Sequence, residues 1–188
     1  SGGQPVGRVA VSGWGCVALA MLLLLLPFPW LAAALTAAGF HELCHAGAVR
    51  LLGGNVGPVE VGTRGAVMEV GDMRPGQELL AAAAGPAGSF LLLGLSRVFP
   101  RLALCGLVQG AYNLLPIYPL DGGRILCCLL RFRLSEERAV WICGWIGLAV
   151  GLAAGIFFAR QGLYPGAAAV FWVALRNIPC KLHKLRVQ

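Results

Sequence analysis

The chain has 188 residues, of which 58% are hydrophobic and only 12% are charged, and its mean hydropathy is +0.77. A soluble domain carries roughly twice that charged fraction, so the composition excludes an ordinary soluble domain and indicates an integral membrane protein. The net charge of +7 comes without a basic face interleaved with aromatic residues, so it does not indicate nucleic-acid binding. It is better explained by Lys and Arg residues in the loops, which set the orientation of membrane helices.

Six membrane-spanning helices are predicted from the apolar runs and the breaks between them. Their approximate ranges are 9–26, 30–52, 77–98, 102–113, 139–159 and 164–175. The fold class expected is an all-α polytopic membrane protein with a short β-hairpin between the second and third helices. The fourth helix is expected to be broken, and the break to line a site. The seven cysteines contain no C-x-x-C pair and lie mostly in apolar runs, which indicates packing residues and no disulfide framework.

Strand character is confined to residues 55–70. Val59-Glu60-Val61 alternates, the next four residues favour a turn, and residues 66–70 can return as a second strand. An extended peptide could add to this hairpin at Val59 and Val61. A surface loop with some alternation explains the same residues and stays open.

The fourth span ends in a proline-rich break that runs from Asn113 to Pro119 and includes Pro116. Asp121-Gly122-Gly123-Arg124 then leads into a further helical piece at residues 125–132. Irregular backbone at membrane depth is tolerated where it is buried in protein or lines a cavity. The break is therefore predicted to form one wall of a site.

Six spans place both termini on one side of the membrane. Eleven Lys and Arg residues fall in loops on that side and three fall on the other, which predicts cytoplasmic termini. The second span then runs toward the cytoplasm, and residue 45 lies roughly 10 Å inside its end.

His41-Glu42-Leu43-Cys44-His45 reads H-E-x-x-H and lies within the second predicted span. Residues four apart share one helix face, so His41 and His45 can direct two imidazoles at one metal ion. Glu42 is close enough to accept a proton from a metal-activated water. The alternative is that these polar residues form hydrogen bonds inside a helix bundle and bind no metal.

A catalytic zinc site needs a third protein ligand. The chain has two aspartates, and Asp121 lies in an apolar stretch at the glycine-rich break, where an unpaired carboxylate would be costly. Asp121 is therefore the expected third ligand of a zinc ion. The alternative, a structural pair with Arg124 one helical turn on, can coexist with it.

Three motifs together resemble the site-2 protease family of intramembrane zinc metalloproteases: H-E-x-x-H, Ala84-Gly85-Pro86, and N-x-x-P-x-x-P-L-D-G-G at residues 113–123. The last motif, with the Val59 to Val61 strand and the six-helix count, is most similar to the sporulation members of that family. Those members cleave the precursor of a mother-cell sigma factor. The resemblance implies one zinc per chain, held by His41, His45 and Asp121, with Glu42 as general base and acid.

The same resemblance implies that Asn113 contacts the substrate and that the stretch with Pro116 and Pro119 positions it. The partners expected are a membrane-associated substrate such as a sigma-factor precursor, the lipid bilayer and inhibitory membrane proteins, with no nucleic acid. The location expected is the bacterial cell membrane or the forespore outer membrane.

We expect residues 1–188 to form a single transmembrane metalloprotease domain without a CBS or PDZ domain. Whether the chain is a piece of a longer protein with a CBS domain stays open. Two competing functions also stay open. One is a membrane protein that binds or transports metal through the same ligands, and the other is an inactive relative.

Overall fold

The structure is a computed structural model that describes residues 9–11, 27–54, 56–62, 65–70 and 73–162, together with residues 164, 167, 168, 170, 171 and 175. The chain divides into two compact units, Ser1–Gly110 and Ala111–Gln188.

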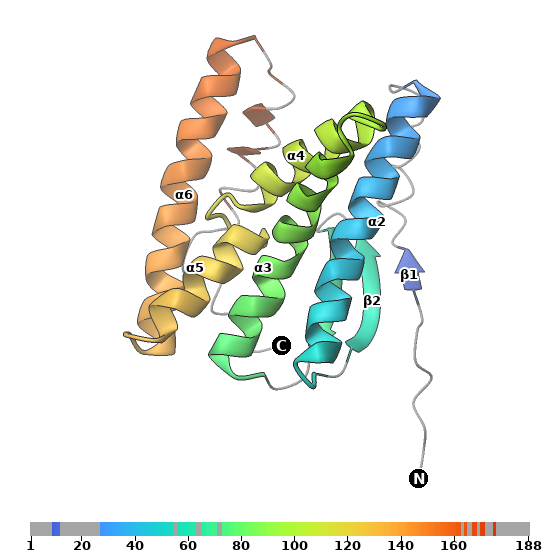
Figure 1. The fold of residues 1–188 in the computed structure, drawn as a ribbon. Coiled ribbons are helices and arrows are strands. Elements are labelled where there is room, and N and C mark those ends of the chain that lie inside the picture. The colour runs from blue at the N-terminus through green and yellow to red at the C-terminus, as the bar shows by residue number, and fades with distance from the viewer. Residues whose placement is uncertain are drawn as a thin grey trace. The chain divides into compact units, whose positions relative to one another are not determined.

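Two antiparallel helices, α2 (Phe28–Leu51) and α3 (Pro75–Leu91), lie side by side in the first unit (Figure 1). Each helix has a proline in its first turn, where a missing N–H costs nothing. The 3₁₀ turn η1 (Leu92–Leu95) continues α3, and α4 (Pro100–Asn113) begins in this unit. The buried residues of α3 are small, which allows its backbone to approach α2 closely: Ala81, Ala82, Gly85, Pro86, Gly88 and Ser89.

A side-chain clip joins the end of α2 to the start of α3. The Gln77 Nε2 atom donates to the Leu52 carbonyl at 2.9 Å, and the Arg74 amide donates to Gln77 Oε1 at 3.1 Å. One side chain thus caps α3 and fixes its first turn against the last turn of α2. Gly53 has a φ of 78°, so the chain turns away from α2 at a residue without a Cβ.

The same unit contains a three-stranded sheet in the order β1-β2-β3, formed by β1 (Val9–Val11), β2 (Val56–Gly62) and β3 (Gly65–Val70). β1 pairs with β2 in parallel, and β3 pairs with β2 antiparallel. β2 is therefore the central strand. Residues 63–64, which would close the predicted hairpin, lie outside the described residues.

The second unit contains the end of α4, then α5 (Asp121–Arg131) and α6 (Glu136–Arg160), which contact each other. Residues 114–120 separate α4 from α5 without regular helix. The acidic first turn and basic last turn of α6 complement the helix dipole.

The mostly helical fold is confirmed, but the predicted start of the first span at Val9 is wrong, because Val9–Val11 form strand β1. Two β-branched residues favour extended backbone here, and β2 supplies the hydrogen-bond partners. Residues 12–26 lie outside the described residues. The helix predicted from Ile125 begins earlier, at Asp121.

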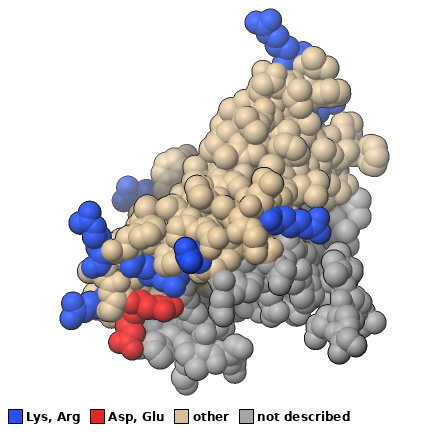
Figure 2. Space-filling view, turned by 60° about the horizontal axis from the view of Figure 1, so that its bottom comes forward, with Lys and Arg blue, Asp and Glu red and all other residues tan. Residues whose placement is uncertain are grey.

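Within the described residues, two helices are long and apolar enough to cross a membrane, Pro75–Leu95 and Glu136–Arg160. The predicted sixth span is described only at single helical residues between 164 and 175, so the count of six stays a prediction. On the face drawn in Figure 2, uncharged residues cover most of the described surface.

Candidate metal centre

His41 and His45 lie one turn apart on α2 and are 2% and 8% exposed. Their Nε2 atoms are 3.2 Å apart, and the two ring planes meet at 82° with centroids 4.7 Å apart. The helical spacing predicted from the motif is thus present, and the two ε nitrogens face each other.

The opposite nitrogen of each imidazole is held by α3. His45 Nδ1 donates to the Ala81 carbonyl at 2.7 Å, and His41 Nδ1 lies 2.8 Å from the hydroxyl oxygen of Ser89. A carbonyl can only accept, so Nδ1 of His45 carries a proton, and in the neutral ring Nε2 has the lone pair. A hydrogen bond at the second nitrogen is the usual way in which proteins orient a metal-binding histidine.

Two glycines on α3 create the space for this arrangement. A Cβ on Gly85 would overlap the His45 imidazole, and a Cβ on Gly88 would overlap the Cys44 side chain. Glycine at these positions therefore lets α3 pass directly against the face of α2 that carries the histidines.

The separation of the two Nε2 atoms fits a metal ion. Zinc binds histidine nitrogen at about 2.0–2.1 Å with tetrahedral geometry, which places two ligand nitrogens about 3.3 Å apart. A proton on one Nε2 atom that is donated to the other would also explain 3.2 Å. Glu42 follows His41 on α2 and is half-buried.

Asp121 is the first residue of α5 in the second unit and is 7% exposed. It lies in the first turn, at the positive end of the helix dipole. A Cβ on Gly122 would overlap the Leu114 carbonyl and one on Gly123 would overlap Ile117 backbone atoms, so these glycines let the break pack on the first turn of α5.

The predicted substrate residues fall in both units. Asn113 is the last residue of α4, and Pro116 and Pro119 are half-buried in the break. Val59 and Val61 lie on the central strand, where β1 and β3 flank them: Val59 is paired with Val9 and Met68, and Val61 with Val11 and Ala66.

The model of peptidase family M50 matches residues 80–154. A zinc metalloprotease of Methanocaldococcus jannaschii is 29% identical over 131 residues, which cover 62% of this chain and 39% of that protein. These matches support peptidase family M50. This chain thus spans about two fifths of that relative's length.

One solved structure has a similar fold. The solved structure of a site-2 protease from Methanocaldococcus jannaschii superposes with a TM-score of 0.72 at 22% identity, covering 93% of each chain. The M50 match contains Gly85, Ser89 and Asp121 and begins after both histidines.

Sequence reasoning missed Ser89, the Ala81 carbonyl and Gln77. Residues 81–89 are mostly small and pack closely on α2, and they also supply the hydrogen-bond partners of both imidazoles. Ser89 could have been predicted from the sequence because it is the one polar residue among the small residues that α3 buries.

Proposed function

We propose that the protein is an intramembrane zinc metalloprotease that hydrolyses a peptide bond of a membrane-associated protein within or near the bilayer. The observation that carries this proposal is the pair of Nε2 atoms in α2, buried, 3.2 Å apart and oriented by α3 through both Nδ1 atoms. The support for the M50 family makes hydrolysis the chemistry to expect at such a pair.

One zinc ion per chain would be held by His41, His45 and Asp121, which leaves a fourth position open. Zinc, when bound, would activate a water and polarise the peptide carbonyl. Glu42 would take a proton from the attacking water and deliver it to the leaving amine nitrogen. Arg124, one turn after Asp121, would act as an outer partner of that carboxylate.

The substrate would have to be extended at the cut, because a helical peptide has its carbonyls bound internally. Asn113 would contact it, and Pro116 and Pro119 would shape the wall beside it. A substrate strand that pairs at Val59 and Val61 would have to take the place of β1, since β3 occupies the other edge of β2.

The resemblance to stage IV sporulation protein FB supports a sporulation sigma-factor precursor as the substrate and inhibitory membrane proteins as regulators. The excess of basic residues in the predicted loops supports a multi-pass protein with both termini in the cytoplasm. The membrane would be that of a bacterial cell or the outer membrane of a forespore.

The test compares wild type with Glu42→Gln in cells that co-express candidate membrane substrates, beginning with a sporulation sigma-factor precursor. Zinc per chain is measured on both purified proteins. We expect cleavage by wild type only, and about one zinc on each protein, because Glu42 moves protons and does not bind the metal.

Cleavage by Glu42→Gln at the wild-type rate would contradict the proposed role of Glu42. Zinc on both proteins with no cleavage of any candidate would favour the metal-handling function, which does not need Glu42. A chain without zinc would overturn the site itself.

Strand addition has a separate test. Val61→Pro removes the amide of Val61 and disturbs pairing along β2, so we expect slower cleavage with zinc retained. Unchanged cleavage would contradict substrate pairing at β2.

A further inference from the structure

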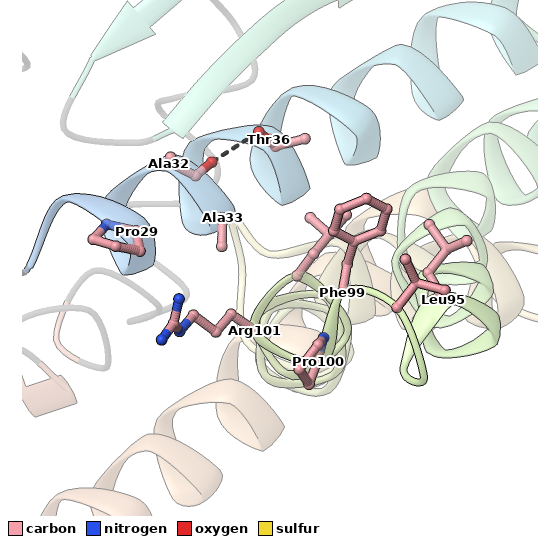
Figure 3. A pocket seen from close by; sticks show the side chains of 10 residues that line it. Pro29, Ala32, Ala33, Thr36, Leu95, Phe99, Pro100 and Arg101 are labelled. Atoms are coloured by element: carbon pink, nitrogen blue, oxygen red, sulfur yellow. Dashed lines mark hydrogen bonds between the residues drawn. The ribbon is translucent and has the colours of Figure 1, made fainter.

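A second concave site lies in the first unit, away from the histidines. The cavity has a volume of about 700 Å³ and opens between the start of α2, the end of η1 and the start of α4 (Figure 3). Thr36 is the lining residue of α2 that is nearest to His41 in sequence, five positions away, or roughly 7.5 Å along a helix, and neither histidine lines the cavity. The cavity is therefore distinct from the candidate metal centre.

The walls of this cavity are apolar. Ala32 and Ala33 line it from α2, and Leu95, Val98 and Phe99 line it from the end of η1 and the residues before α4. The Thr36 hydroxyl also lines the cavity, but it donates to the Ala32 carbonyl of its own helix at 2.8 Å. The space is thus shaped for a chain of methylene groups.

One cation lies among the described lining residues, Arg101, which is exposed and extends from the first turn of α4 toward the α2 side of the cavity (Figure 3). Its guanidinium lies 5.8 Å from the ring centroid of Trp30. Within the part of the chain that the structure describes, Arg101 forms no ion pair. A tryptophan beside an arginine at helix ends is typical of the membrane–water interface.

The start of α4 adds to this positive charge. Because α4 begins at Pro100, the amides of Arg101 and Leu102 belong to its first turn and have no carbonyl partner within the helix. First-turn amides and the helix dipole favour an anion. The first turn of α4 and the guanidinium that extends from it therefore both offer positive charge to a phosphate group beside an apolar cavity.

The lining disfavours a peptide. It comes largely from α2, η1 and the first turn of α4, so most of its backbone groups are bonded within their own helix. The N–H groups of an inserted peptide would lose water without gaining acceptors, whereas an acyl chain has no polar groups to satisfy.

We propose that this cavity binds one anionic phospholipid, with an acyl chain against Ala32 and Ala33 and the phosphate at Arg101. The inference requires membrane insertion of the chain, but it does not depend on proteolysis.

The test is native mass spectrometry of the full chain released from detergent, with phosphatidylglycerol or phosphatidylcholine of identical acyl chains added. We expect tighter binding of phosphatidylglycerol by wild type. Arg101→Gln should weaken it about fivefold, the ratio for a cation–headgroup contact of roughly 1 kcal/mol. Ala33→Phe should weaken both lipids by filling the space of the acyl chain.

Arg97→Gln is the matched control, because Arg97 is an exposed arginine four residues earlier that does not line the cavity. Equal binding of the two lipids by wild type, or equal effects of the Arg97 and Arg101 variants, would overturn the proposal. So would displacement of the lipid by a soluble substrate peptide, which would assign the cavity to peptide. If Glu42→Gln selects phosphatidylglycerol as wild type does and neither protein cleaves, the lipid site stands while the proposed protease function fails.

Discussion

His41 and His45 are oriented by chemically different partners. The Ala81 carbonyl permits one arrangement of protons on His45, whereas the Ser89 hydroxyl can donate to His41 or accept from it. The Nε2 lone pair of His41 is therefore available to a metal only when its Nδ1 donates to Ser89. Ser89 is a positioning residue that acts through His41.

Ser89→Ala removes this partner and leaves a buried imidazole nitrogen without it. We expect zinc affinity to fall about tenfold, in the range found for outer partners of metal ligands, while the chain still folds. Competition with a chromophoric chelator measures the affinity. Ser96→Ala, at an exposed serine just after η1, is the control and should leave it unchanged.

At the residue scale, the sequence predicted both histidines through their spacing, and it could not predict what holds them. Ser89 and Ala81 lie 48 and 36 residues away from their partners. Such contacts depend on the register between two antiparallel helices, which no local pattern encodes. Asp121 as a third ligand stays a prediction.

The approach of α3 to α2 depends on the absence of side chains at two positions. Gly85→Ala would force its new methyl group into the His45 imidazole. We expect the helices to separate locally, at a cost of about 1–3 kcal/mol in the free energy of unfolding, and zinc to be lost. Zinc content and thermal unfolding in detergent measure both effects.

Gly47→Ala is the matched control for this prediction. Gly47 lies in α2 two residues after His45, and a Cβ there meets nothing within 4 Å. The control should bind zinc as wild type does, since alanine favours helix. Equal zinc content in the two variants would contradict the packing argument.

The clip at Gln77 is expected to contribute modestly. Gln77→Ala removes the hydrogen bonds to the Leu52 carbonyl and from the Arg74 amide. We expect a loss of about 1 kcal/mol in the free energy of unfolding, as for a typical hydrogen bond. Thermal unfolding of Gln77→Glu, which keeps an acceptor for Arg74 and loses the donor to Leu52, separates the two contributions.

At the element scale, apolar runs located both ends of α2 and α6 and the start of α3 to within three residues, because burial and length dominate there. The predicted end at residue 98 lies beyond α3, which ends at Leu91 and is followed by η1. The apolar pattern did not predict the structure of short segments that can form either a helix or another structure. Val9–Val11 is apolar enough for a helix, yet it becomes a strand because β2 lies beside it. Glycine normally disfavours helix, yet α5 begins at Asp121. Gly122 and Gly123 are needed there because they let backbone atoms of Leu114 and Ile117 pack on its first turn.

At the scale of the whole molecule, composition alone indicated a membrane protein, since few soluble domains carry so little charge. Topology is the prediction that belongs here. Reporter fusions at either end should both be active in the cytoplasm, because basic residues concentrate on that side. A fusion after Arg97 should report the opposite side, and cytoplasmic activity there would contradict the six-span arrangement.

The Gln77 side chain holds the end of α2 and the start of α3 together independently of the residues that connect them. The last turn of α2 and the first turn of α3 touch, so the residues between Leu52 and Arg74 leave and return at almost the same place. They form an insert on a closed helical hairpin, and the two histidines with their supports lie outside it. Replacing residues 55–72 with a short glycine–serine linker should therefore yield a chain that still loads zinc. The segment that forms β2 and β3 could then be replaced by another sequence without changing the two helices that carry the candidate metal site.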